Sequence, residues 1–140
     1  MKNILTNLMT SAVLLIGIGR GLEAQTTQMH AAVPFAWQMN NRQLSAGDYV
    51  ITRNANAKVL RIQDKNGTGA YLLLSAGSDK NSATRLVFHR YGDRYFLAEV
   101  VAPGQAVSKL SVSRNEKEAM QSEQPREVAT VFVDVRPIVN

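Results

Sequence analysis

The chain has 140 residues, enough for one domain, and it contains no cysteine. The missing thiols exclude disulfides, thiolate metal sites, cysteine nucleophiles and a lipid anchor on an N-terminal cysteine. The 16 basic and 11 acidic residues give a net charge of +5, but the basic residues are scattered, which indicates a solvated basic surface.

The first two dozen residues have the layout of a secretory signal peptide. Lys2 precedes an apolar run over residues 8–18, and Ala24 offers a small residue for cleavage. The run is well short of the roughly 20 residues that a membrane-spanning helix needs. We therefore expect residues 1–24 to be removed and residues 25–140 to form a single, monomeric β-rich domain without a membrane span. The expected location is periplasmic or extracellular.

Short β-like segments separated by turn residues recur along the rest of the chain. The first, residues 33–40, alternates large apolar side chains with other residues. Pro34 predicts that this strand begins or edges a sheet, because proline lacks a backbone donor. Ala46-Gly47 predicts a turn into a second strand at 48–53.

Asn66-Gly67 marks a hairpin between strands at 57–63 and 69–76. Both residues tolerate the positive φ angles of a two-residue type I′ turn. In that register one apolar face would form from the cross-strand pairs Ile62–Tyr71 and Leu60–Leu73.

The stretch LVFHRYGDRYFLAEVV, residues 86–101, predicts another hairpin with its turn at Gly92-Asp93. A two-residue type II′ turn suits glycine at the first central position and places His89 opposite Phe96. A three-residue loop would shift the register by one residue and gather a cleaner apolar face. The sequence leaves both registers open.

Residues 108–113 and 127–135 predict two further strands, with one helix between them. Ser113 and Glu116 fit a capping box, in which each side chain binds the other residue's backbone N–H, and residues 114–121 are rich in helix formers. This polar helix is expected on the surface. The whole pattern predicts an all-β fold of about eight short antiparallel strands in mostly meandering order, arranged as a small barrel or a two-sheet sandwich. The sequence does not separate barrel from sandwich, or a hollow interior from a filled one.

Three blocks, VPFAW, LSAGDYVIT and LVFHRYGDRYFLAEV, together resemble a family of small secreted bacterial proteins without an assigned activity. Its members carry a signal peptide, a Val-Pro-Phe strand, a Leu-Pro-Ala-Gly-x-Tyr turn and a similar hairpin. The resemblance covers roughly residues 33–118, and the hairpin is its most specific part. This chain departs from the pattern at Ser45, where proline is usual, and at Trp37. The resemblance implies a secreted β-rich protein and no catalytic residues.

Residues suited to catalysis or metal binding are sparse. The only histidines, His30 and His89, are too few for a zinc site, and His30 is expected in a flexible N-terminal segment. A less favoured alternative is a hydrolase that uses His89 with Asp93 or Glu99. Neither acid falls on the rung of His89, and Glu99 is expected to be exposed or paired with an arginine such as Arg85. We therefore predict a non-enzymatic protein with no catalytic residue, metal or cofactor.

Arginines and tyrosines around the 86–101 hairpin are the best candidates for a ligand-binding surface. Tyrosine rings can stack on sugars, and guanidinium groups can hold anionic groups. The predicted ligand-binding residues are Arg85, His89, Arg90, Tyr91, Arg94 and Tyr95. We expect this surface, or the barrel interior, to bind an envelope component such as a polysaccharide, a lipid or another anionic ligand. The alternative is a structural or partner-binding envelope protein that uses an edge strand. Secretion argues against a nucleic-acid partner.

Overall fold

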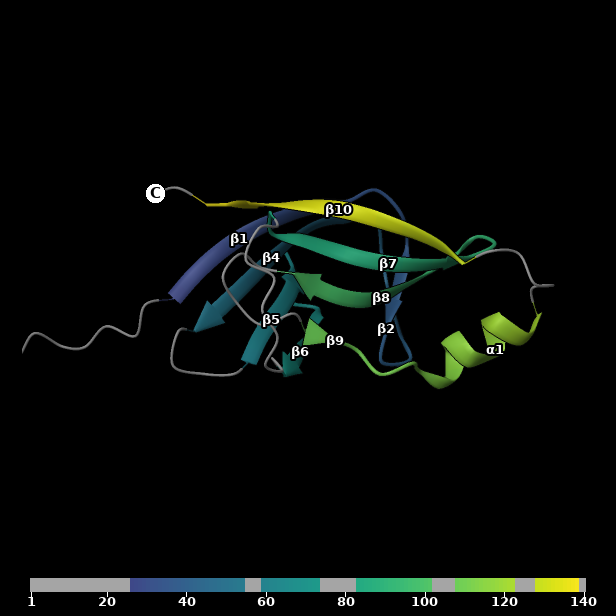
Figure 1. Ribbon diagram of the computed structural model, residues 1–140. Coiled ribbons are helices and arrows are strands. Elements are labelled where there is room, and N and C mark those ends of the chain that lie inside the picture. The colour runs from purple at the N-terminus through teal and green to yellow at the C-terminus, as the bar shows by residue number, and fades with distance from the viewer. Residues whose placement is uncertain (1–25, 55–58, 74–82, 102–107, 123–127, 139–140) are drawn as a thin grey trace, which may run out of the picture.

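The computed structural model describes residues 26–54, 59–73, 83–101, 108–122 and 128–138 (Figure 1). The predicted signal peptide, residues 1–24, lies outside the described residues. Within them the chain forms ten strands and one helix: β1 (Thr26–Val33), β2 (Trp37–Met39), β3 (Arg42–Leu44), β4 (Gly47–Asn54), β5 (Val59–Asp64), β6 (Gly69–Leu73), β7 (Arg85–Tyr91), β8 (Arg94–Val101), β9 (Ser108–Lys109), α1 (Arg114–Ser122) and β10 (Ala129–Pro137).

All ten strands belong to one sheet, in the order β3-β2-β8-β7-β10-β1-β4-β5-β6, with β9 added to β8. The neighbours pair antiparallel, except that β2 runs parallel to β8. Five pairs of consecutive strands follow the predicted meandering order: β2–β3, β4–β5, β5–β6, β7–β8 and β8–β9. Strand β10, however, lies between β1 and β7 and so joins the two halves of the sheet. The sheet curls until it nearly closes into a barrel, which confirms the all-β prediction and selects the barrel over the sandwich.

The two edge strands of the sheet meet where the barrel closes. Arg42 of β3 donates a hydrogen bond from Nη1 to the carbonyl oxygen of Gly69 in β6, at 3.0 Å. Inside the barrel, the ring of Trp37 from β2 contacts that of Tyr49 from β4, with centroids 5.2 Å apart. Side chains therefore bridge the gap that backbone pairing leaves open.

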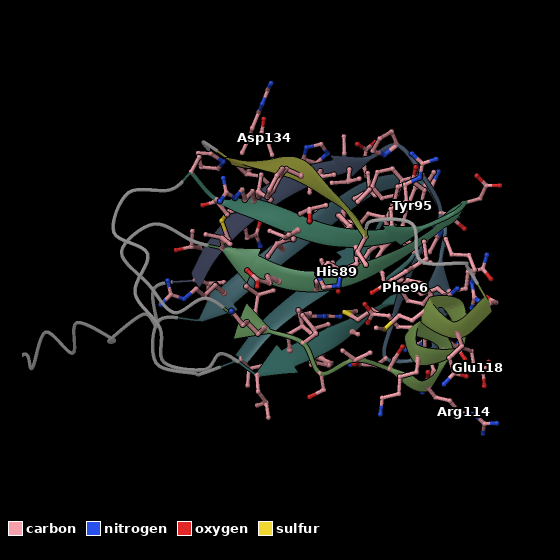
Figure 2. All side chains as sticks on the ribbon, turned by 45° about the vertical axis from the view of Figure 1, so that its right-hand side comes forward. His89, Tyr95, Phe96, Arg114, Glu118 and Asp134 are labelled. Atoms are coloured by element: carbon pink, nitrogen blue, oxygen red, sulfur yellow. The ribbon has the colours of Figure 1, made fainter. Side chains whose placement is uncertain are left out.

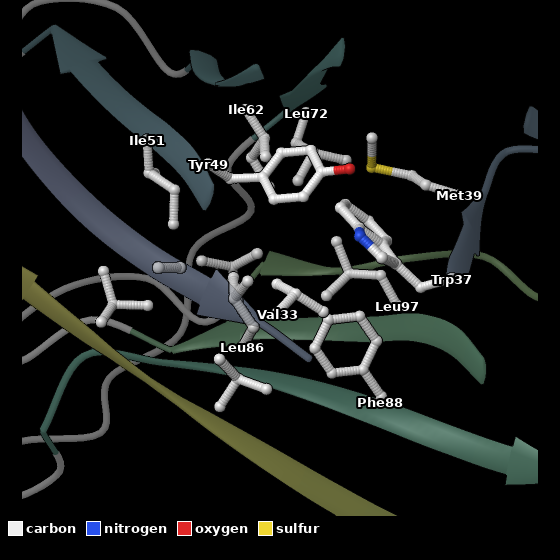
Figure 3. Packing of buried hydrophobic residues seen from close by; sticks show 14 of the residues in the cluster. Val33, Trp37, Met39, Tyr49, Ile51, Ile62, Leu72, Leu86, Phe88 and Leu97 are labelled. Atoms are coloured by element: carbon white, nitrogen blue, oxygen red, sulfur yellow. The ribbon is translucent and has the colours of Figure 1, made fainter. Parts of the chain in front are cut away.

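The interior of the barrel is filled by side chains (Figure 3). Trp37 packs edge-on against Phe88 as well as Tyr49. The largest fully buried side chains of the interior come from both halves of the sheet: Trp37, Tyr49, Phe88, Met39, Ile51, Leu60, Ile62, Leu86, Val33 and Val100. Within the described residues the interior is packed with side chains, so the candidate binding surfaces that the structure offers lie on its outside.

Strand β1 was not predicted from the sequence. It pairs with β10 and with all of β4, and His30 at its middle lies opposite Arg136 on one side and Val50 on the other. The expectation of a flexible segment around His30 is therefore wrong. Pro34 follows β1 directly and lies in the corner that leads to β2. The predicted strand at 33–40 shortens to β2, which turns into β3 through Asn40 and Asn41 at φ angles of 48° and 65°.

The register predicted for the β5–β6 hairpin is wrong by one residue. Gln63 pairs with Gly69, and the Asp64 N–H donates to the Thr68 carbonyl oxygen at 2.8 Å, which leaves a three-residue loop at 65–67. Gly67 in this loop has a positive φ, 78°. Asp64 decides this, because its Oδ1 accepts hydrogen bonds from the backbone N–H groups of Asn66 and Thr68 at 2.9 and 2.8 Å. The one-residue shift turns two predicted core residues outward, so that Tyr71 is 65% and Leu73 78% exposed.

The β7–β8 hairpin combines the two registers that the sequence left open. At its tip the two-residue turn holds, with Tyr91 opposite Arg94, His89 opposite Phe96, and Gly92 at a φ of 57°. A bulge between Val87 and Phe88 then shifts the register, leaving Ala98 as the extra residue. The bulge keeps Leu86, Phe88, Leu97 and Val100 on the core side.

Candidate functional site

The six predicted ligand-binding residues do not lie on one surface of the structure. Arg85 lies at the far end of β7 from the turn, opposite Asp134 of β10. The other five lie near the turn, but the alternation along a strand sends them to two faces. His89, Tyr91 and Arg94 face outward toward α1, whereas Arg90 and Tyr95 lie on the core side.

Arg90 and Tyr95 belong to a stack of groups that satisfy one another. Tyr95 stacks on Phe35 with ring centroids 3.8 Å apart and an interplanar angle of 12°. The Arg90 guanidinium lies 5.6 Å from the Tyr95 centroid, and its Nε donates to the carbonyl oxygen of Gly92 at 2.7 Å. This stack covers the end of the core, so packing alone accounts for the positions of Arg90 and Tyr95.

Helix α1 is fixed to the outer face of the hairpin through a buried carboxylate. Glu116 is only 4% exposed, and its Oε1 lies 2.9 Å from His89 Nδ1 and accepts a hydrogen bond from the Tyr91 hydroxyl at 3.3 Å. One of the two hydrogen bonds of the predicted capping box forms: the Glu116 N–H donates to Ser113 Oγ at 3.2 Å. The carboxylate does not follow the capping-box prediction, however, because it turns to the sheet.

Asn115 extends the contact between α1 and the sheet. Its backbone N–H donates to Asn41 Oδ1 at 3.2 Å, and its side-chain amide donates to Gln38 Oε1 at 3.1 Å. Arg94 Nη2 donates to the Asn115 carbonyl at 3.4 Å. Behind these polar contacts, Ala119 packs with Tyr91 and Phe96 in a small apolar cluster.

The Tyr91 hydroxyl is held in its protonated form. Burial raises the pKa of Tyr91 above its ordinary value of 10.0, and the charge of Glu116 and the hydrogen bond to it raise that pKa further. A neutral hydroxyl is what the contact requires, because Tyr91 is the donor to Glu116.

The acids proposed for a hydrolase site are not the partners of His89. Glu99 lies opposite Val87, and its Oε1 is 3.5 Å from Lys109 Nζ, so its partner is a lysine of β9 and not Arg85. His89 contacts Glu116, 27 positions along the chain. Among the described residues no group of three or more His, Asp or Glu side chains is placed to hold a metal ion, and no described helix is both long and apolar enough to cross a bilayer.

A groove of about 430 Å³ opens on the outer face of β1 and β10, which lie side by side in Figure 1. Its lining residues are His30, Ala32, Pro34, Phe132, Val133, Asp134 and Arg136. Phe132 is 55% exposed, with the Arg85 guanidinium 4.8 Å from its ring centroid. Asp134 points away from the barrel (Figure 2). The side chains of Asp134 and Arg136 make no hydrogen bond or ion pair within the described residues, whereas His30 Nε2 lies 3.0 Å from Asp48 Oδ1.

Comparison of the chain with protein-family models, with curated proteins and with solved structures finds no match. The resemblance to small secreted bacterial proteins therefore stays a prediction.

The sequence did not lead us to predict a role for two residues of the candidate sites, Glu116 and Phe132. Glu116 was assigned to the helix cap, and nothing local indicates that its carboxylate meets a histidine on another element. Phe132 had a usable signal: Val131, Val133 and Val135 alternate with it, and their shared phase is the core side. A large aromatic residue in the opposite phase, among Thr130, Asp134 and Arg136, indicates an exposed ring.

Proposed function

We propose that the protein is a secreted or periplasmic, non-enzymatic domain that binds a component of the cell envelope in the groove between β1 and β10. One observation carries this proposal. A half-exposed aromatic ring, Phe132, stands beside a carboxylate and a guanidinium that have no partner within the described residues, around a hollow of about 430 Å³. Ligand sites combine an apolar surface with a few convergent polar groups in a hollow of this size.

The secreted location rests on the predicted signal peptide. The non-enzymatic character is supported by the way in which the best acid–base pair is used. His89 and Glu116 hold α1 on the sheet together with Tyr91, so their proximity has a structural explanation. Of the predicted ligand-binding residues, Arg85 belongs with the groove, because its guanidinium lies over the Phe132 ring.

The test is a titration of the protein with purified envelope polysaccharides and with vesicles of envelope lipids, by isothermal titration calorimetry. Phe132→Ala is expected to weaken the binding that wild type shows by at least about tenfold, because the ring supplies the main apolar contact. Tyr71→Ala is the matched control: Tyr71 is 65% exposed and carries the Arg61 guanidinium 5.6 Å from its ring centroid, but it lies on β6. Equal loss in both variants, or no binding by wild type, would overturn the proposal.

A further inference from the structure

We infer that the groove between β1 and β10 takes an uncharged saccharide, an inference that rests on the function proposed above. Its first support is the shape of the groove. Ala32 lies on the outer face of β1, and its short side chain leaves a hollow between Phe132 and Pro34 at one end and Arg136 at the other. The hollow is open to solvent along the sheet, so it suits a segment of a longer chain as well as a small molecule.

Phe132 provides a surface of the kind that sugar rings contact. A pyranose ring has an apolar face of C–H groups, and this face packs on the electron-rich face of an aromatic ring. With 55% of the residue exposed, the Phe132 ring keeps free surface despite the Arg85 guanidinium over it. The arginine also restricts the ring, which lowers the entropy lost when a ligand binds.

The polar groups of the groove match hydroxyl groups. The Asp134 carboxylate accepts hydrogen bonds and the Arg136 guanidinium donates them, and neither has a partner among the described residues. A sugar hydroxyl both donates and accepts, so adjacent hydroxyls can bind the two groups at once.

The charges of the groove decide between an uncharged ligand and an anionic one. Among the residues that line the groove, Arg136 contributes one positive charge and Asp134 contributes one negative charge two residues away. The groove is therefore balanced, although the whole chain carries +5. A phosphate, sulfate or uronate would lie against the Asp134 carboxylate, and juxtaposed like charges oppose binding. A hydroxyl-rich, uncharged ligand meets no such repulsion.

The experiment uses Asp134→Asn, whose effect has opposite signs for the two ligand classes. Wild type is titrated with three neutral oligosaccharides (cellohexaose, maltohexaose and chitohexaose), with polygalacturonate, and with phosphatidylglycerol vesicles. We expect binding to at least one neutral oligosaccharide, with an affinity that changes less than about twofold between 50 and 500 mM NaCl. Asp134→Asn is expected to weaken it about tenfold, because hydrogen bonds to a charged acceptor are the stronger ones.

Asp93→Asn is the matched control, since Asp93 is an exposed aspartate in the β7–β8 turn. Binding to polygalacturonate or vesicles that Asp134→Asn strengthens and Phe132→Ala weakens would overturn the uncharged-saccharide inference and leave the proposed function intact. Binding of a neutral oligosaccharide that Asp134→Asn leaves unchanged would also overturn the inference, because the site would lie elsewhere. No binding of any probe would overturn both.

Discussion

Polar side chains have opposite environments in two regions of the outer face of the sheet, the region under α1 and the groove between β1 and β10. Under α1, Glu116, His89 and Tyr91 are bound to one another, and the carboxylate is withdrawn from water. In the groove, Asp134 and Arg136 face solvent and lack partners among the described residues. Burying a carboxylate is favourable only when it is bound, so the cluster under α1 is explained by folding alone. In the groove, Asp134 and Arg136 are exposed and can contact a ligand, which makes β10 the candidate binding surface.

The contrast arises within a few residues of one strand pair. His89 of β7 lies opposite Thr130 of β10, and Val87, two residues along, lies opposite Phe132. Helix α1 covers the hairpin side of this face, while the β10 side stays open around Phe132. The same sheet surface thus serves a packing role at one end and is available for binding at the other.

The largest expected difference in stability is between alanine variants of two phenylalanines on neighbouring strands. Phe88 is fully buried against Trp37 and Phe35, whereas Phe132 is 55% exposed. Phe88→Ala should lower the free energy of unfolding by about 3–5 kcal/mol, through lost burial and the cavity left behind. Phe132→Ala should change it by about 0.5 kcal/mol. Urea unfolding followed by tryptophan fluorescence measures both, and a cost for Phe132→Ala close to that of Phe88→Ala would mean that the ring serves the fold.

A second comparison separates two glutamates on one helix. Glu116→Ala removes the acceptor of His89 and Tyr91 and should lower the free energy of unfolding by about 1–3 kcal/mol. Glu118→Ala is the matched control, because Glu118 is exposed and its contact is an ion pair with Arg114 at 3.0 Å, worth about 0.3–0.5 kcal/mol. Urea midpoints of the two variants check this. Equal losses would show that the buried carboxylate adds nothing beyond a surface ion pair.

The sequence predicts the elements that depend on local chemistry. The helix at 114–121 appears as Arg114–Ser122 because Ser113 caps it, and the Gly92-Asp93 turn forms because glycine accepts the positive φ at its first position. The Asn66-Gly67 hairpin also forms, but its register was missed. The Asp64 side chain binds two backbone N–H groups of the loop and favours the three-residue form over the type I′ turn.

The candidate site depends on contacts between distant residues, and these the sequence does not specify. Glu116 and His89 are 27 positions apart, and β1 is recognisable as a strand only once β10 and β4 flank it. The ligand-binding prediction clustered residues that are close in sequence. Strand alternation places these residues on two faces of the sheet, so closeness in sequence did not bring them onto one surface, and their role in binding stays a prediction. Arg85 kept a role because its cross-strand neighbours on β10 form the groove.

The smallest effect concerns the Tyr91 hydroxyl and appears only at alkaline pH. The pKa of Tyr91 is raised in the folded protein by burial, then by Glu116, so above pH 10.0 the unfolded chain loses this proton while the folded chain keeps it. Unfolding then releases a proton, and stability falls as pH rises, by about 1.4 kcal/mol per pH unit for each such group. Below pH 10.0 the Tyr91 hydroxyl is protonated in both states, so it does not make the free energy of unfolding depend on pH.

Above pH 10.0, the free energy of unfolding should therefore fall less steeply with pH in Tyr91→Phe than in wild type. The two slopes should differ by the contribution of one proton, about 1.4 kcal/mol per pH unit. Burial also raises the pKa of Tyr49, and Tyr49 is present in both proteins, so its contribution cancels in the comparison. Urea unfolding in small pH steps gives the two slopes, with Tyr71→Phe as the control for loss of an exposed hydroxyl. Parallel slopes for wild type and Tyr91→Phe would mean that α1 has already separated from the sheet at that pH. The contacts of Glu116 would then be weaker than its burial indicates.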